Sequence, residues 1–213
     1  MRLAYLHGFA SGPGSTKARF FAARAAECGR ELVVPDLAPD FTGMTIGSML
    51  AIVDAILDGG ATVLFGSSLG GYLASLAAVR RPERVPALVL LAPAFGFAAR
   101  WEARVGPRAM ARWRTTGTAP VYHYGREREE PLSIALLDDA RRYDAMPDPT
   151  CPALVLHGRR DDSVPLAAAE AFVAARPDRR RLVVYDARHE LTEVMDALWT
   201  EAERFLGALG MSI

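Results

Sequence analysis

Short apolar runs recur along the chain, and most are followed by a segment with one apolar face. Six runs rich in Leu, Val and Ala predict strands at residues 2–6, 32–34, 62–65, 87–91, 154–156 and 182–185. Their apolar positions are largely consecutive, which is typical of strands that are buried on both faces of a sheet. The pattern therefore predicts short, buried strands.

The segments between these runs carry helical periodicity. Between residues 49 and 57, apolar side chains recur at i, i+3, i+4 and i+7, which forms one apolar helix face. Further helices are predicted at residues 16–28, 69–80, 167–176 and 194–206, and Ser15 is placed to cap the first. Strands that alternate with such helices predict an α/β fold with about six mostly parallel strands. We expect one domain over residues 1–213, because this length suits one core.

Residues 94–150 break the alternation. This stretch is rich in arginine and aromatic residues and contains no convincing strand. Helices are expected at about residues 107–114 and 133–143. We interpret residues 94–150 as a small helical cap inserted over the ends of the strands.

Composition narrows the classes of function. The formal net charge is zero, which argues against a nucleic-acid partner. No apolar run approaches the roughly 20 residues that cross a bilayer, so no membrane partner is expected. The start of the chain lacks the long apolar core of a signal peptide, and there are only two cysteines. We therefore expect a cytoplasmic protein. No metal-ligand spacing is present, and neither a metal nor a cofactor is expected.

The motif at residues 66–70 suggests the chemistry. An apolar strand leads into Gly-Ser-Ser-Leu-Gly and a helix follows, so the turn would expose one hydroxyl at the edge of the sheet. We predict that Ser68 is a nucleophile. Ser67 is the alternative hydroxyl, although its position suits a hydrogen bond within the turn.

A serine hydroxyl needs a base, and the base needs a carboxylate. His189 follows the last strand and precedes the last helix, so it is the candidate base. His7 and His157 are expected to shape loops, and His123 either lines a pocket or packs. Asp161 and Asp162 compete as the acid, with Asp162 alternatively capping the next helix. Asp186 precedes the base and is interpreted as a turn residue.

Four motifs resemble those of α/β hydrolases: residues 7–9, 66–71, 157–165 and 188–190. Residues 6–18 and 66–72 further resemble small bacterial YqiA-type esterases. The resemblance selects Asp161 as the acid in the order Ser68, Asp161, His189. It also implies an oxyanion hole formed by the backbone N–H groups of Phe9 and Leu69.

The expected activity is hydrolysis of a small-molecule carboxylic ester through an acyl-enzyme. A thioesterase or another acyl or carbon–carbon hydrolase uses the same fold, and so does a ligand sensor that keeps the triad without turnover. The loop after His7 reads Gly-Phe-Ala, where many lipases have three glycines. Because of this difference, the sequence does not define the shape of the acyl pocket. It does not define the oligomeric state either.

Overall fold

A computed structural model describes residues 1–211 of the chain. Six strands form one sheet in the order β2–β1–β3–β4–β7–β8, and every neighbouring pair is parallel. The strands are β1 (Arg2–Leu6), β2 (Leu32–Val33), β3 (Thr62–Ser67), β4 (Leu88–Leu91), β7 (Ala153–Gly158) and β8 (Arg180–Tyr185). The predicted parallel sheet is confirmed.

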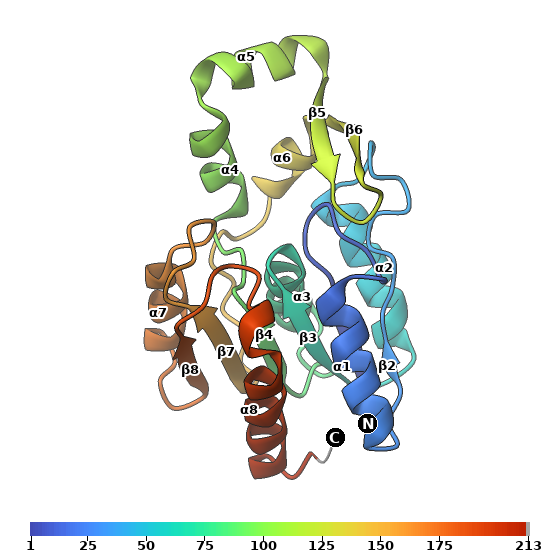
Figure 1. Cartoon of the computed structure of the whole chain (residues 1–213), viewed down its shortest axis with the longest axis vertical. Helices are drawn as coiled ribbons and strands as arrows, with labels where there is room; N and C mark the ends of the chain where they lie inside the picture. The colour runs from blue at the N-terminus through green and yellow to red at the C-terminus, as the bar shows by residue number, and fades with distance from the viewer. Residues whose placement is uncertain (212–213) are drawn as a thin grey trace.

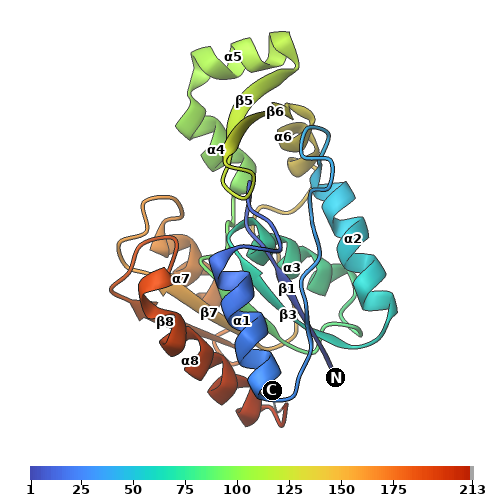
Figure 2. The same ribbon diagram turned by 45° about the vertical axis from the view of Figure 1, so that its right-hand side comes forward.

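Helices cover both faces of this sheet (Figures 1 and 2). One face packs against α1 (Thr16–Glu27) and α8 (Met195–Ala208), which follows the short 3-10 helix η1 (Thr192–Val194). The other face packs against α2 (Ile46–Asp58), α3 (Leu69–Arg80) and α7 (Leu166–Ala174). Alternate side chains of each central strand enter the two layers, which explains why their apolar positions are consecutive.

Polar caps decide where two helices begin. The Ser15 hydroxyl accepts a hydrogen bond from the Ala18 amide, so the predicted cap of α1 is confirmed. Helix α2 begins at Ile46, which is the first buried residue of its apolar face, because Thr45 and Ser48 form a reciprocal capping box. Such caps satisfy amide groups that have no partner within the helix.

The insertion contains strands, which corrects the expectation for residues 94–150. Its elements are α4 (Phe97–Val105), α5 (Pro107–Thr116), β5 (Thr118–His123), β6 (Arg128–Ser133) and α6 (Ala135–Ala140). Strands β5 and β6 pair antiparallel with Pro120 opposite Pro131. Proline and charge hid the strand pattern, but each strand of a two-stranded ribbon has a free edge that tolerates proline.

The insertion lies over the carboxyl ends of the strands (Figures 1 and 2). One continuous cluster of buried apolar side chains runs from α2 and α3 into it, and includes Trp113, Leu132 and Leu136. The insertion and the sheet thus share one apolar cluster within residues 1–211, and the single domain over residues 1–213 stays a prediction. Among the described helices, none combines the length and the apolar character needed to cross a bilayer.

Candidate active site

The turn between β3 and α3 projects Ser68 from the end of the sheet. Ser68 has φ of +53° and ψ of −115°, a strained conformation for a residue with a side chain. Glycine is required on both sides of it. A Cβ atom on Gly66 would lie 2.5 Å from the Gly70 carbonyl oxygen, and one on Gly70 would lie 2.0 Å from the Leu6 carbonyl oxygen. Close packing of α3 against β1 and β3 therefore imposes the turn.

Three segments that are distant in the chain meet at Ser68. His189 Nε2 lies 3.0 Å from Ser68 Oγ, and His189 Nδ1 lies 2.7 Å from Asp161 Oδ2. Ser68 follows β3, Asp161 follows β7, and His189 follows β8. An ionised carboxylate has no proton to donate, so Nδ1 donates to Asp161 and Nε2 accepts from the serine hydroxyl.

The surroundings of Asp161 keep it ionised. Its side chain is fully buried, and burial alone would raise the pKa of the carboxyl group. Hydrogen bonds from His189 and from the backbone amides of Ser163 (2.9 Å) and Val164 (2.7 Å) outweigh that effect and hold the pKa below its usual value. Asp161 is therefore suited to orient an imidazole and to stabilise an imidazolium.

The competing side chains lie elsewhere. Ser67 is buried as the last residue of β3. Asp162 is exposed, and its carboxylate accepts a hydrogen bond from the Ser163 hydroxyl at 3.4 Å. The proposed capping role of Asp162 is wrong, because Asp161 caps the turn and α7 has no side-chain cap. Asp186 is exposed and pairs with Arg160.

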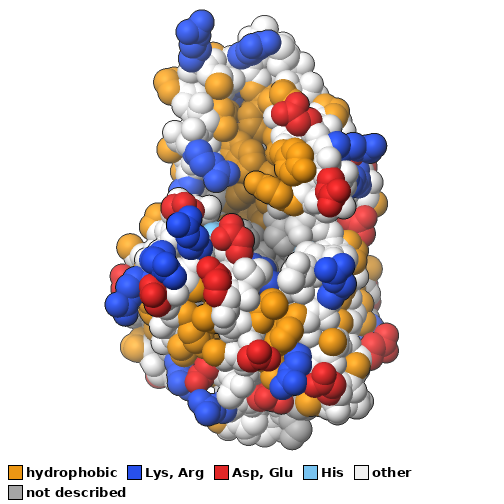
Figure 3. Space-filling view, in the orientation of Figure 1, with side chains coloured by type: hydrophobic (Ala, Val, Ile, Leu, Met, Phe, Trp, Pro, Cys, Tyr) orange, Lys and Arg blue, Asp and Glu red, His pale blue; other side chains and the backbone are white. Residues whose placement is uncertain are grey.

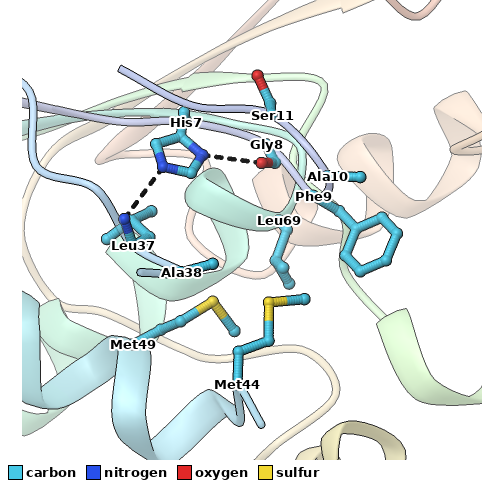
Figure 4. A pocket seen from close by; sticks show the side chains of 10 residues that line it. All are labelled: His7, Gly8, Phe9, Ala10, Ser11, Leu37, Ala38, Met44, Met49 and Leu69. Carbon is cyan, nitrogen blue, oxygen red and sulfur yellow. Dashed lines mark hydrogen bonds between the residues drawn. The ribbon is translucent and has the colours of Figure 1, made fainter. Parts of the chain in front are cut away.

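The other histidines shape loops or pack. His7 Nε2 accepts a hydrogen bond from the Leu37 amide at 3.1 Å, so Nδ1 carries the proton and lies 3.0 Å from the Gly8 carbonyl (Figure 4). His157 Nε2 donates to the Val164 carbonyl at 3.0 Å. His123 is buried with its ring 4.7 Å from that of Phe41. The loop-shaping interpretation of His7 and His157 is confirmed.

The amides of Phe9 and Leu69 lie in the two loops that flank Ser68. Within residues 1–211, neither N–H group donates a hydrogen bond to another protein group. A Cβ atom on Gly8 would lie 3.5 Å from Ser68 Cβ, so the backbone before Phe9 runs close to the serine. Figure 4 shows Phe9 and Leu69 bordering the same recess. These amides can therefore donate hydrogen bonds to a negative charge that develops near Ser68 Oγ.

Two apolar hollows adjoin this edge. The recess in Figure 4 has a volume of about 10 Å³, room for about one water-sized group, and is lined by Leu37, Met44 and Met49 as well as Leu69. Figure 3 shows a wider hydrophobic hollow between α4–α5 and the β5–β6 hairpin. The ring of Phe9 lies 4.6 Å from that of Trp101 on α4. Apolar surface is thus available for a substrate.

Reasoning from the sequence missed Lys17 and Arg100. Lys17 Nζ donates to the Glu190 carbonyl at 2.7 Å, next to His189. Arg100 on α4 donates to the Ser163 carbonyl at 2.8 Å, beside Asp161. Arginine is common in the insertion, so no signal singled out Arg100. The signal for Lys17 was its rarity, because it is the only lysine in the chain.

The site as described contains no metal centre. Among residues 1–211, no group of three or more His, Cys, Asp or Glu side chains is arranged to hold an ion.

Sequence comparison relates the chain to known proteins. A family described as "Uncharacterised protein family (UPF0227)" matches residues 2–206. The mouse palmitoyl-protein thioesterase ABHD10, a mitochondrial protein, is 30% identical over 170 residues, which cover 76% of this chain and 56% of the relative. The human protein is 31% identical over 122 residues, 55% of this chain and 39% of the relative. The chain thus spans about half the length of the curated relatives that it matches, or less.

Solved structures share its fold. Mouse ABHD10 superposes with a TM-score of 0.79 at 22% identity, covering 97% of this chain and 90% of the other. A putative hydrolase from Agrobacterium vitis S4 gives 0.82 at 25% identity, covering 96% and 87%. Est1E from Butyrivibrio proteoclasticus with bound ferulic acid gives 0.77 at 19% identity, covering 97% and 90%. The chain has the α/β-hydrolase fold and belongs to the UPF0227 family.

Proposed function

We propose that this chain is a serine hydrolase that cleaves carboxylic esters. The observation that carries the proposal is the chain of contacts from Ser68 through His189 to Asp161 at the ends of three strands. In this assignment, Ser68 is the nucleophile, His189 the general base and acid, and Asp161 the residue that orients the imidazole.

Acylation would begin with attack of Ser68 Oγ on the ester carbonyl carbon, while the hydroxyl proton moves to His189 Nε2. The carbonyl oxygen becomes an oxyanion, which the N–H groups of Phe9 and Leu69 stabilise. The N-terminus of α3 adds its positive end. The tetrahedral intermediate then collapses, and His189 gives the proton to the departing alcohol oxygen. An acyl group remains on Ser68.

Deacylation would reverse these roles with water. His189 takes a proton from the water as its oxygen attacks the acyl carbon, and the same amides hold the second oxyanion. Collapse breaks the bond to Ser68 Oγ, which recovers its proton from His189. The products are a carboxylic acid and an alcohol, and the protein returns to its starting state.

The primary test is hydrolysis of short p-nitrophenyl esters by the wild type, Ser68→Ala and the matched control Ser67→Ala. We expect Ser68→Ala to lose at least about 10³-fold in kcat, because removal of a triad member has that scale of effect. A phosphonofluoridate probe should label Ser68, as located by peptide mass spectrometry. Wild-type turnover by Ser68→Ala, or labelling confined to Ser67, would refute the assignment.

Thioester cleavage is the second candidate, and the similarity to the palmitoyl-protein thioesterase ABHD10 favours it. The same attack and proton transfers apply, with a thiol as leaving group. Acyl-CoA and p-nitrophenyl esters of matched chain length would separate the two by kcat/KM. Tight binding of a small molecule without turnover on either series would instead indicate a ligand sensor.

A further inference from the structure

Lys17 joins two parts of the candidate site. It lies in the first turn of α1, directly after the loop that carries Phe9, and its Nζ donates to the backbone carbonyl of Glu190 at 2.7 Å. Glu190 follows His189 in the chain. A single side chain therefore connects the segment with one proposed oxyanion amide to the segment with the proposed base.

The loop that carries His189 is anchored at its two ends. Ala187 is buried, and its carbonyl accepts a hydrogen bond from the Arg160 amide at 3.0 Å. Leu191 is buried with φ of +56°, and its amide donates to the Arg188 carbonyl within the same loop. Between these anchors, Lys17 is the only group from outside the loop, within the described chain, that donates to a carbonyl of residues 188–190.

The identity of residue 17 is unusual for this chain. The sequence has 25 lysine and arginine residues, and Lys17 is the only lysine. An ammonium is a compact charge on a flexible stem, whereas a guanidinium is a broad planar fork. Either group can donate to one carbonyl oxygen, but the guanidinium keeps its charge whereas an ammonium can lose its proton when it is buried.

We infer that Lys17 is a positioning residue: its ammonium holds the Glu190 carbonyl, and thereby keeps the His189 imidazole in line with Ser68. This inference rests on the proposed function. Among the described residues, no hydrogen bond joins the Lys17 side chain to that of Ser68 or His189, so Lys17 acts through the backbone of the loop.

The charge of Lys17 makes the strength of its bond to the Glu190 carbonyl depend on pH. Burial lowers the pKa of Lys17 to about 8, although three carboxylates facing it, Glu190, Asp161 and Glu193, act in the opposite direction. The ammonium is therefore mostly charged at pH 7 and loses its proton above about pH 8. A charged donor makes a stronger hydrogen bond than a neutral amine. The loop that carries His189 is therefore held best below about pH 8.

The experiment compares wild type, Lys17→Met, Lys17→Arg and the control Arg19→Met in hydrolysis of a short p-nitrophenyl ester. Arg19 is an exposed cation on the same helix. Lys17→Met keeps the stem but removes the donor, and we expect kcat to fall about tenfold while KM stays within about twofold. Lys17→Arg should recover most of kcat, and Arg19→Met should match the wild type.

The pH profile separates positioning from a merely structural role. Wild-type kcat should decline above about pH 8, whereas Lys17→Arg should lack that decline because its guanidinium stays protonated. Unchanged kcat in Lys17→Met, an effect on KM alone, or the same basic decline in Lys17→Arg would each overturn the inference. Thermal unfolding checks that Lys17→Met folds.

The outcomes for Lys17 and for the proposed function are distinguishable. If Ser68→Ala keeps full turnover, the proposed function fails whatever Lys17 does. If turnover and probe labelling depend on Ser68 but Lys17→Met behaves as wild type, only the inference about Lys17 fails. The rate of phosphonofluoridate labelling at Ser68 gives a second readout that does not depend on the choice of ester.

Discussion

The carboxyl edge of the sheet and the insertion above it are built by different means. At the edge, backbone approaches backbone so closely that Gly66, Gly70 and Gly158 have no room for a Cβ atom. In the insertion, side chains add to the backbone pairing of β5 and β6: Glu130 pairs with Arg126 and with Arg128. Close backbone contacts thus leave little room for change at the edge, whereas side chains that can change rotamer help to hold the insertion.

The two regions share one buried apolar cluster and are also joined by backbone and side-chain hydrogen bonds. The Tyr124 amide in the hairpin donates to the Ala10 carbonyl at 2.9 Å, and the Ser133 amide donates to the Thr42 carbonyl at 2.9 Å. Tyr72 on α3 donates its hydroxyl proton to the Asp144 carbonyl at 2.9 Å. This division suggests that changes at the edge affect kcat or folding, whereas changes in the insertion affect substrate binding.

The largest effect is expected for Asp161→Asn at the edge. The amide oxygen still caps the turn at Ser163 and Val164, but the side chain no longer fixes the correct imidazole tautomer. We expect kcat to fall about 10³–10⁴-fold. Steady-state hydrolysis of p-nitrophenyl esters measures this loss of kcat, and Asp162→Asn serves as the neighbouring control. Equal losses in the two variants would contradict the choice of Asp161.

Gly70→Ala should test the close packing of the edge. Its Cβ atom would lie 2.0 Å from the Leu6 carbonyl oxygen and 2.6 Å from that of His7, so backbone must move. We expect the free energy of unfolding to fall by about 3 kcal/mol, or roughly 10 °C in Tm. Gly207→Ala in α8 meets no atom within 4 Å and should be neutral or slightly stabilising. Similar melting temperatures for both variants would count against this account.

Trp101→Ala should show the smaller effect expected of the insertion. The indole on α4 packs against the Phe9 ring, with the ring centroids 4.6 Å apart. We expect KM for a medium-chain p-nitrophenyl ester to rise about tenfold, with kcat within about threefold of the wild type. Tyr122→Ala, which removes an exposed aromatic from the same insertion, is the control. A loss confined to kcat would show that the insertion acts on chemistry instead.

The parts of the fold that follow from local pattern were predictable. Strands buried on both faces produce apolar runs, and helices between them produce a 3.6-residue period, so the parallel sheet and its helices could be read directly. The β5–β6 hairpin could not be predicted in this way. Its strands carry Pro120, Pro131 and several charges, and only pairing of the two edges makes them strands.

The candidate site also has features that the sequence predicts and features that it does not. The strained turn at Ser68 has a local signature of glycines, and the positions of the candidate acid and base after later strands follow from topology. Contacts between distant loops do not follow from a local signature or from topology. That Asp161 and not Asp162 faces His189 depends on how the loop after β7 turns, and the bond from Lys17 to Glu190 spans 173 positions in the chain.

By itself, the sequence determined the α/β sheet, the turn that projects Ser68 and the order of the three candidate residues. These depend on side-chain periodicity and on glycine, which act over a few residues. The resemblance to α/β hydrolases already pointed to Asp161, and only the tertiary structure decided how the insertion folds and what Lys17 contacts. Those outcomes depend on the packing of segments far apart in the chain, where the free energies of many weak contacts decide jointly.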